Sequence, residues 1–333
     1  MESKKKLFHR KKKLIICITG ASGFIGSHLV NQLSKENVSI RVLTRSTSNQ
    51  FHEGIEIFVG DLLSPSFNFK GFLKNCDVVI NCAGETVDYE IMKKLHIDSL
   101  AKIIKFIERI FIDEGKRVQL IQLSSVGVYG PASNPNQKRI IIESSKNNPI
   151  GQYEITKKMA DDLIIKKGKD NLFSYTILRP SNVVGLRMPN QSFNHLLKAI
   201  KNKYFFYIGS RISISNYLHI DDLIEAIIIC AKNNEALNQI FNLSNDCPLS
   251  EIVNKVSYTH GQKSYHLCLP ANLIRLFSSL INKVIRLPIN HNRINALVSR
   301  TKYPTCKIEK TLGFNFKKNI PDFSIEYLNS DND

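Results

Sequence analysis

The first apolar run of the chain, Leu14–Thr19, ends in a glycine-rich stretch that leads directly into a helical pattern. The glycines are spaced G-x-x-G-x-x-G, one residue longer than the G-x-G-x-x-G form of many dinucleotide-binding turns. Glycines between a parallel strand and a helix let backbone N–H groups approach a phosphate, and the helix N-terminus favours its negative charge. We therefore expect a pyrophosphate-binding turn here. The residues expected to contact a cofactor are Gly20, Ser22, Gly23, Phe24, Ile25 and Gly26.

Short apolar runs alternate with helical patterns over the first half of the chain. Strands are expected at Leu14–Thr19, Ser39–Thr44, Ile55–Val59, Val78–Cys82, Val118–Ser124 and Phe173–Leu178, and helices at Phe24–Ser34, Ser66–Leu73, Met92–Ile112 and Gln152–Lys167. This alternation is typical of successive β-α units and a parallel sheet. The sequence therefore predicts an α/β fold built on a Rossmann-type, doubly wound parallel sheet.

The pattern changes after Arg179-Pro180, which we interpret as the break that follows the last of these strands. Beyond it, loops that contain proline separate shorter helices, so we expect a smaller C-terminal substrate-binding lobe over the carboxyl edge of the sheet. The predicted organisation is a basic N-terminal tail (1–13), a Rossmann domain (14–180) and the lobe (181–330), of which about 206–244 return to the sheet.

Composition excludes several classes of protein. A chain of 333 residues with 43% hydrophobic and 23% charged residues is an ordinary globular protein. No uncharged apolar run approaches the roughly 20 residues that cross a bilayer, and the N-terminus lacks the apolar stretch of a secretory signal. We therefore expect a cytoplasmic protein without stable membrane insertion.

The formal net charge is +17, of which Met1–Lys13, with seven Lys or Arg and one Glu, contributes +6. Because no basic stripe interleaved with aromatic residues follows this tail, we interpret it as a solvated terminus and expect no nucleic-acid partner. The remaining positive charge favours anionic small substrates.

Seven cysteines are scattered along the chain without a C-x-x-C pair. They fit neither a disulfide framework nor a zinc site, so we expect reduced, mostly buried thiols and no metal. Ala271–Arg286 spaces apolar residues at helical intervals and carries a basic opposite face. We expect this amphipathic segment to pack against the sheet domain, with binding to a membrane surface as the alternative.

Seven further motifs follow in order along nearly the whole chain. They are Gly60-Asp61-Leu62, Asn81-Cys82-Ala83-Gly84, Leu123-Ser124-Ser125-Val126-Gly127-Val128-Tyr129-Gly130, Tyr153-Glu154-Ile155-Thr156-Lys157, Arg179-Pro180-Ser181-Asn182-Val183-Val184-Gly185, Asn216-Tyr217-Leu218-His219-Ile220-Asp221-Asp222 and Leu312-Gly313-Phe314. Together with the glycine-rich turn they resemble the extended branch of the short-chain dehydrogenase/reductase superfamily, which contains nucleotide-sugar epimerases, dehydratases and reductases. The resemblance implies that residues 14–180 bind NAD(P), with contacts at Asp61, Leu62, Cys82, Ala83 and Gly84.

Tyr153 and Lys157 of the Y-x-x-x-K motif are four residues apart on a predicted helix, so they share one face. An unperturbed tyrosine titrates near ~10, and a cation held close favours its phenolate. The resemblance implies that Tyr153 exchanges a proton with a substrate oxygen and that Ser125 hydrogen-bonds the same oxygen. It also implies that Lys157 tunes Tyr153 and contacts the nicotinamide ribose.

Val126-Gly127 stands where the 4,6-dehydratases of this branch carry an Asp-Glu pair. Neither side chain can act as an acid or base, so the sequence argues against dehydration. Of the reactions found in this branch, hydride transfer by an epimerase or by a dehydrogenase/reductase remains as the expectation.

The second strand ends at Leu43-Thr44-Arg45-Ser46, whereas NAD-binding members usually carry Asp or Glu at this tip. A carboxylate repels a 2′-phosphate, while Arg45 would pair with one. NADP(H) is therefore the favoured cofactor, with NAD(H) as the alternative.

The resemblance implies substrate contacts at Thr86, Ser125 and Asn182. The Arg that often precedes the family's Asp-Tyr-Ile-His segment is replaced by Ser215. We expect Arg211 to substitute for it, with Arg187, Arg275 and Arg293 as further candidates. His96-Ile97-Asp98-Ser99 replaces the family's usual Asn-centred turn, which removes the basis for a proton relay there.

The leading hypothesis is hydride transfer at a ring carbon, most readily C4, of a nucleotide-activated sugar, by a 4-epimerase or a 4-keto-reductase/dehydrogenase. The family implies a role in surface-polysaccharide biosynthesis and a homodimer paired through the helices around Met92–Ile112 and Gln152–Lys167. The alternatives are an NADP-dependent reductase of a steroid-like or flavonoid-like ketone and a non-catalytic NADP-binding sensor.

Overall fold

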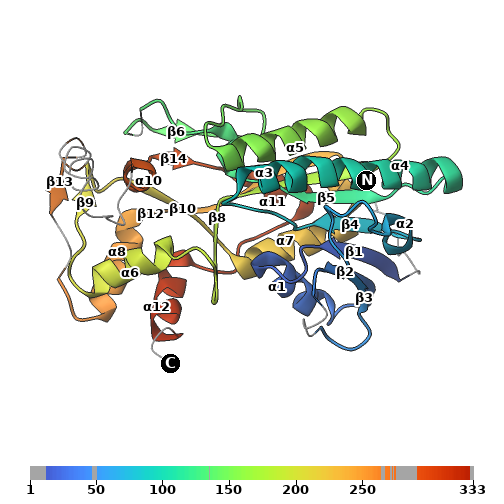
Figure 1. Cartoon of the computed structure of the whole chain (residues 1–333). Coiled ribbons are helices and arrows are strands. Elements are labelled where there is room, and N and C mark those ends of the chain that lie inside the picture. The colour runs from blue at the N-terminus through green and yellow to red at the C-terminus, as the bar shows by residue number, and fades with distance from the viewer. Residues whose placement is uncertain are drawn as a thin grey trace, which may run out of the picture.

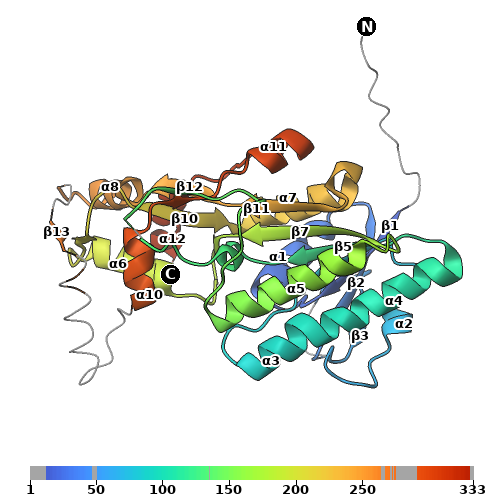
Figure 2. The ribbon, with the colours of Figure 1, turned by 90° about the horizontal axis from the view of Figure 1, so that it is seen from above.

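The computed structural model describes residues 13–46, 51–134, 136–263, 267–270, 272, 274 and 291–330. Its centre is a seven-stranded parallel sheet with the order β11-β7-β5-β4-β1-β2-β3, in which β7 and β11 are labelled in Figure 2 and the other strands in Figure 1. The strands are β1 (Leu14–Thr19), β2 (Val38–Thr44), β3 (Glu56–Val59), β4 (Val78–Asn81), β5 (Gln119–Leu123), β7 (Ser174–Pro180) and β11 (Gln239–Leu243). The strand order reverses between β1 and β4, which confirms the predicted doubly wound fold.

Helices cover both faces of this sheet. On one face, α1 (Phe24–Leu33) and α7 (Ile220–Lys232) pack against Ile16 and Ile18 of β1. On the other, α2 (Phe69–Phe72), α4 (Ser99–Glu114) and α5 (Gln152–Gly168) pack against Cys17. Successive side chains of a strand point to opposite faces, and so β1 contributes to both cores. Figure 2 shows α4 and α5 side by side along the sheet.

The expected helix Met92–Ile112 is interrupted, which corrects the prediction. The structure has α3 (Tyr89–Lys93), a π-helical turn η1 (Lys94–Asp98) and then α4. The extra residue of a π-turn leaves the apolar pattern on either side intact, so periodicity does not detect it.

The expected break at Arg179-Pro180 is also wrong, because β7 continues through both residues and pairs Pro180 with Leu243 of β11. Proline has a backbone angle that suits extended structure, and its missing N–H costs little at the last residue of a strand.

The second part of the chain forms a lobe beside the carboxyl edge of the sheet. Its three-stranded sheet has the order β12-β10-β8, from β12 (Asn245–Pro248), β10 (Ile214–His219) and β8 (Asn182–Val184). The helices α6 (Ser192–Lys201), α8 (Leu249–Thr259) and α12 (Ile320–Ser330) pack together around a core that includes Phe193, Ile252 and Phe323. The lobe therefore has a hydrophobic core of its own.

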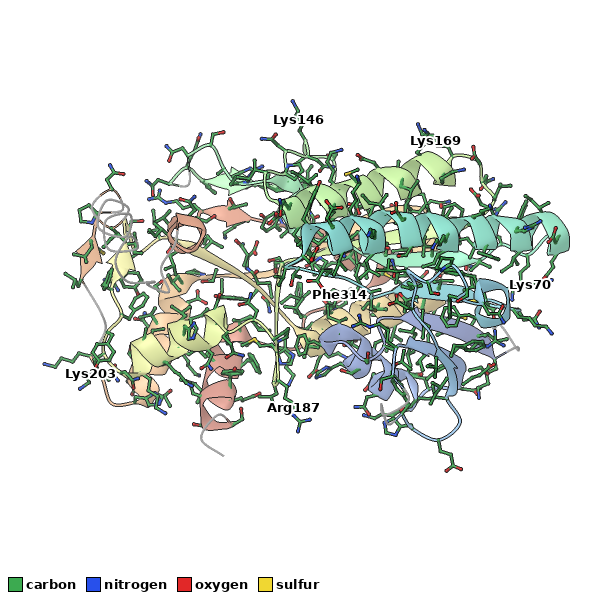
Figure 3. The ribbon with its side chains drawn as sticks, viewed as in Figure 1. Lys70, Lys146, Lys169, Arg187, Lys203 and Phe314 are labelled. Atoms are coloured by element: carbon green, nitrogen blue, oxygen red, sulfur yellow. The ribbon has the colours of Figure 1, made fainter. Side chains whose placement is uncertain are left out.

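Short elements complete the fold. They are η2 (Val126–Tyr129), β6 (Arg139–Ile140), β9 (Tyr207–Ile208), η3 (Asn234–Ala236), β13 (Cys268–Leu269), α10 (His291–Val298), β14 (Thr301–Lys302) and α11 (Cys306–Leu312). Phe314, which follows α11, is buried in the core under β1, whereas Lys146 and Lys169 point away from the ribbon (Figure 3).

All seven cysteines are free, and Cys17, Cys76, Cys230 and Cys247 are buried. Within the described ranges, no helix is long and apolar enough to cross a membrane. Apart from residues 13, 272 and 274, the basic tail and the amphipathic segment Ala271–Arg286 lie outside the described residues.

Candidate active site

A chain of buried polar side chains joins the carboxyl ends of β1, β4 and β5. The Thr19 hydroxyl donates to Asn81 Oδ1 at 2.5 Å, and Asn81 Nδ2 donates to Gln122 Oε1 at 2.8 Å. Gln122 Nε2 in turn donates to the carbonyl oxygen of Leu123 at 3.0 Å. These bonds fix the edge of the sheet at which doubly wound folds bind ligands.

The glycine-rich turn after β1 is too tight for side chains at two positions. Gly20 has φ +66°, and a Cβ atom there would lie 2.6 Å from the backbone nitrogen of Ala83. A Cβ atom at Gly26 would lie 2.1 Å from the carbonyl oxygen of Gly20. Gly23, the N-cap of α1, provides no side chain to cap the helix, so the N–H groups of the first turn of α1 receive no side-chain cap. The turn therefore suits an anion held by backbone groups, such as a pyrophosphate.

The same turn touches the lobe through Phe24. A Cβ atom at Gly185, just after β8, would lie 3.1 Å from Cζ of Phe24. The Phe24 ring packs against the cores of both the sheet and the lobe. The turn thus lies where the two parts of the molecule meet.

The ends of β2 and β3 carry the residues expected near the adenosine half of a cofactor. Arg45 is exposed directly after β2. The Gly60 N–H donates to the carbonyl of Thr44 at 2.9 Å, which places the following Asp61 beside the end of β2. Asp61 Oδ1 accepts from the N–H of Leu63 at 2.8 Å, so this carboxyl group also shapes its own turn.

Tyr153 and Lys157 of α5 lie beside the end of β5, where Ser125 begins η2. Lys157 lies one turn after Tyr153 on α5, and its Nζ is 5.7 Å from the centre of the Tyr153 ring. The buried Lys157 ammonium donates to the Leu123 carbonyl at 3.0 Å. Ser125 Oγ accepts from the N–H of Gly127 at 3.0 Å and caps η2.

Burial dominates the protonation of this pair. It lowers the pKa of Lys157 to about 8, although Asp161 and Cys82 act in the opposite direction. It raises the pKa of Tyr153 to about 12, and the neighbouring charge of Glu154 adds to the rise. In the protein alone the phenol is therefore protonated at neutral pH and suited to donate a proton.

The loop after β4 lies between the glycine-rich turn and α5. Cys82 and Ala83 are half-buried, whereas Gly84 and Thr86 are exposed. A Cβ atom at Gly84 would lie 3.7 Å from Lys157 Nζ and 3.5 Å from Nε2 of His96. Gly84, one of the loop residues expected to contact a cofactor, therefore borders the lysine, and Thr86 follows two residues later.

Glu154 brings a carboxyl group into the site that sequence reasoning missed. A Cβ atom at Gly127 would lie 2.6 Å from Glu154 Cγ, and one at Gly151 would lie 2.0 Å from its Oε2. The side chain therefore covers Gly127 and turns its carboxyl group toward the start of α5, where a helix favours negative charge. The sequence could have indicated this, because Glu154 lies three residues after Gly151, the N-cap of α5, where a glutamate often folds back toward the helix start.

A buried ion pair behind the site was also missed. Arg179 Nε lies 3.0 Å from Asp161 Oδ2, and Arg179 Nη1 donates to the Tyr129 hydroxyl oxygen at 2.8 Å. The Tyr129 hydroxyl donates to Asn242 Oδ1 at 2.8 Å. This network ties α5 to β7 and β11. The sequence could have indicated a buried charge here, because Asp161 lies four positions after Lys157 on the same face of the predicted helix.

The expected substrate residues of the lobe occupy two places. Asn182, in β8, is exposed and donates from Nδ2 to the carbonyl of Asn216 in β10 at 3.2 Å. Arg211 lies beyond β9, with its guanidinium carbon 5.5 Å from the centre of the Tyr207 ring. Asn182 is thus close in sequence to the Gly185 contact with Phe24, while Arg211 belongs to another part of the lobe.

The model of the NAD dependent epimerase/dehydratase family matches residues 16–244. A UDP-glucose 4-epimerase of Vibrio cholerae is 25% identical over 287 residues, which cover 82% of this chain and 84% of the relative. The structure of a UDP-glucuronic acid 4-epimerase from Bacillus cereus in complex with NAD superposes with a TM-score of 0.69 at 18% identity, covering 93% of this chain and 96% of that one. The structure of RMD from Pseudomonas aeruginosa complexed with NADPH gives a TM-score of 0.66 at 16% identity, and the match covers 96% of this chain and 99% of that one.

Proposed function

Because the chain belongs to the NAD-dependent epimerase/dehydratase family, we propose that it binds a nicotinamide dinucleotide and transfers hydride at a ring carbon, C4, of a nucleotide-activated sugar. The observation that carries this proposal is the placement of Tyr153 and Lys157 at the end of β5, which lies two residues before Ser125, and next to the loop that borders the glycine-rich turn. The relative and the B. cereus structure are 4-epimerases of UDP-sugars by name, which supports the substrate class.

The residues present fit such a cofactor. The uncapped start of α1 and the tight turn at Gly20 and Gly26 would hold the pyrophosphate through backbone N–H groups. Lys157, together with the loop at Gly84, would hold the nicotinamide ribose. A nicotinamide bound there supplies or accepts the hydride.

Tyr153 moves the proton in this proposal. Its pKa is raised to about 12, so the phenol carries its proton at neutral pH and can donate it to the oxygen of a ketone as an alcohol forms. The Lys157 charge, 5.7 Å from the ring centre, then stabilises the phenolate that remains. The Ser125 hydroxyl orients the same substrate oxygen.

We also propose that dehydration is not the reaction. The residues after Ser125 are Val126 and Gly127, which carry no acid or base. The neighbouring carboxyl group of Glu154 is turned toward Gly151. This arrangement supports oxidation and reduction without elimination of water.

The preference for NADP(H) rests on Arg45 alone. This residue is exposed at the end of β2, beside the turn that begins at Asp61, and a guanidinium there would pair with a 2′-phosphate. NAD(H) is the alternative, and comparing the Kd values of the four dinucleotides distinguishes the two.

The proposal is tested by incubating the full chain with a panel of UDP-sugars and 4-keto nucleotide sugars, each with NAD⁺, NADP⁺, NADH or NADPH. Interconversion of C4 epimers without net change in cofactor absorbance indicates an epimerase. Stoichiometric oxidation of NADPH or NADH with a 4-keto sugar indicates a reductase. Absence of turnover across the panel in a protein that binds the cofactor would contradict the substrate class.

A further inference from the structure

His96 is buried at the centre of the π-helical turn η1, with 1% of its surface exposed. The turn interrupts a helix that would otherwise run continuously from α3 into α4. Single π-turns within α-helices frequently occur at functional sites, because they redirect one side chain.

Both ring nitrogens of His96 are engaged by protein groups. Nε2 lies 3.1 Å from the backbone nitrogen of Glu85 and accepts its N–H. A neutral imidazole has one donor and one acceptor nitrogen, so the hydrogen resides on Nδ1. Nδ1 lies 2.9 Å from Thr156 Oγ1, and the Thr156 hydroxyl donates to the carbonyl of Tyr153 at 2.9 Å. Every donor in this series of hydrogen bonds, from Glu85 to Tyr153, thus has an acceptor.

These bonds connect the two sides of the site. On one side, the loop that contains Glu85 begins at Cys82 and Ala83, whose backbone atoms pack closely against Gly20 of the glycine-rich turn. On the other side, Thr156 and Tyr153 belong to the first turns of α5. The His96 ring also meets the Tyr153 ring edge-on, with 5.8 Å between their centres.

We propose that His96 is a positioning residue that holds the Gly84–Thr86 loop against the start of α5, as a neutral imidazole with its hydrogen on Nδ1. It thereby sets the place of the cofactor-side loop relative to Tyr153 and Lys157. It transfers no proton, because Nε2 faces a backbone N–H. This inference rests on the proposed function for its effect on turnover.

Burial and the nearby charge of Lys157 together keep the ring neutral. Lys157 from α5 is the cation that faces it, and the aromatic neighbour is Tyr153. The Glu85 carboxylate is turned toward the N–H groups of Thr86 and Val87, each 2.7 Å away. Burial, with a smaller effect of Lys157, lowers the pKa of His96 to about 3. A histidine that exchanged protons in catalysis would instead titrate near ~6.5.

The first test measures the imidazole directly in the wild-type protein by ¹⁵N NMR between pH 5 and 8, with the His96 signal assigned by its loss in His96→Leu. The expected result is the Nδ1–H tautomer, unchanged over this range. A hydrogen on Nε2, or titration between pH 6 and 7, would overturn the proposal.

The second test compares His96→Leu with His96→Gln. The glutamine amide oxygen reaches the position of Nε2 and can accept the Glu85 N–H, whereas leucine removes both hydrogen bonds. Because a net hydrogen bond is worth about a few-fold to tenfold in an equilibrium constant, His96→Leu should raise the Kd for the dinucleotide roughly three- to tenfold, and His96→Gln should restore it. His195→Gln, on the exposed face of α6, is the matched control.

Equal Kd values for wild type and a folded His96→Leu, or no difference between the two His96 variants, would overturn the proposal. The tautomer and the dinucleotide affinity do not depend on the sugar. If no sugar is turned over by the wild-type protein, the proposed function fails while these two measurements still decide the role of His96.

Discussion

The ammonium group of Lys157 donates a hydrogen bond to the carbonyl oxygen of Leu123, 3.0 Å away. The same carbonyl accepts from Gln122, which belongs to the polar chain across β1, β4 and β5. The position of the Lys157 charge is therefore set by the edge of the sheet as well as by α5. Sequence spacing predicts that Lys157 lies near Tyr153, but not that a backbone carbonyl holds it.

The pH dependence of activity should follow Lys157. Burial lowers its pKa to about 8, so the cation that stabilises the phenolate is present below pH 8 and is lost as the pH rises above it. We expect kcat/KM for reduction to fall above about pH 8, whereas the Tyr153 phenol, with a pKa raised to about 12, stays protonated. Rate profiles from pH 6 to 10 check this. A flat profile to pH 10 would show that the Lys157 charge is not required.

Gly26 should be essential for cofactor binding. A Cβ atom there would lie 2.1 Å from the Gly20 carbonyl oxygen, so Gly26→Ala must displace the turn. We expect the Kd for the dinucleotide to rise by at least about tenfold, since small displacements of binding groups are costly. Gly115→Ala is the control. Gly115 also has a backbone conformation that a side chain strains, with φ +65°, but it caps the C-terminal end of α4 and is not part of the glycine-rich turn. This substitution should cost about 1 kcal/mol in free energy of unfolding and leave the Kd unchanged.

Arg45→Asp should change the choice of cofactor. If Arg45 pairs with a 2′-phosphate, a carboxylate in its place should weaken NADPH binding by about 10- to 100-fold and spare NADH. Titration calorimetry with both cofactors measures the effect, and Lys146→Asp, at an exposed lysine (Figure 3), controls for the change in net charge. An equal loss of affinity for NADPH and NADH would show that Arg45 does not bind the 2′-phosphate.

Removing one partner of the buried ion pair should destabilise the fold. Arg179 and Asp161 are 2% and 0% exposed in their side chains, so Asp161→Leu leaves a buried guanidinium without its carboxylate. The expected loss is about 3–5 kcal/mol in free energy of unfolding, measured by urea denaturation. The double variant Asp161→Leu with Arg179→Met should recover much of it. An unchanged midpoint in the single variant would mean that the pair is solvated in solution.

The sequence predicted the sheet well because apolar runs bounded by turns report burial directly. Leu14–Thr19 matches β1 residue for residue, and β11 completes the sheet after the lobe begins. Periodicity failed at Lys94–Asp98, since a π-turn adds one residue without disturbing the apolar faces on either side. The break predicted at Arg179-Pro180 was wrong for a different reason, because a strand can end on a proline.

The candidate site was predictable only where one short motif carries several of its residues. Tyr153 and Lys157 share a helix face, and the glycine spacing marks the turn. The partners of His96 lie 11 and 60 positions away in sequence, and no local pattern brings Glu85 and Thr156 to one ring. The pKa of Tyr153 was expected to fall beside a cation, yet in the protein alone burial raises it to about 12.

The most direct test of the mechanism is Tyr153→Phe. The ring and its contact with His96 remain, so the fold and the Kd for the dinucleotide should be unchanged, while the hydroxyl that carries the proton is gone. We expect kcat to fall by about 10²–10⁴-fold, the usual contribution of general acid-base catalysis. The measurement is kcat with a turned-over nucleotide sugar alongside the dinucleotide Kd for the same preparation. A kcat close to that of the wild type would show that another group handles the proton and would contradict the mechanism.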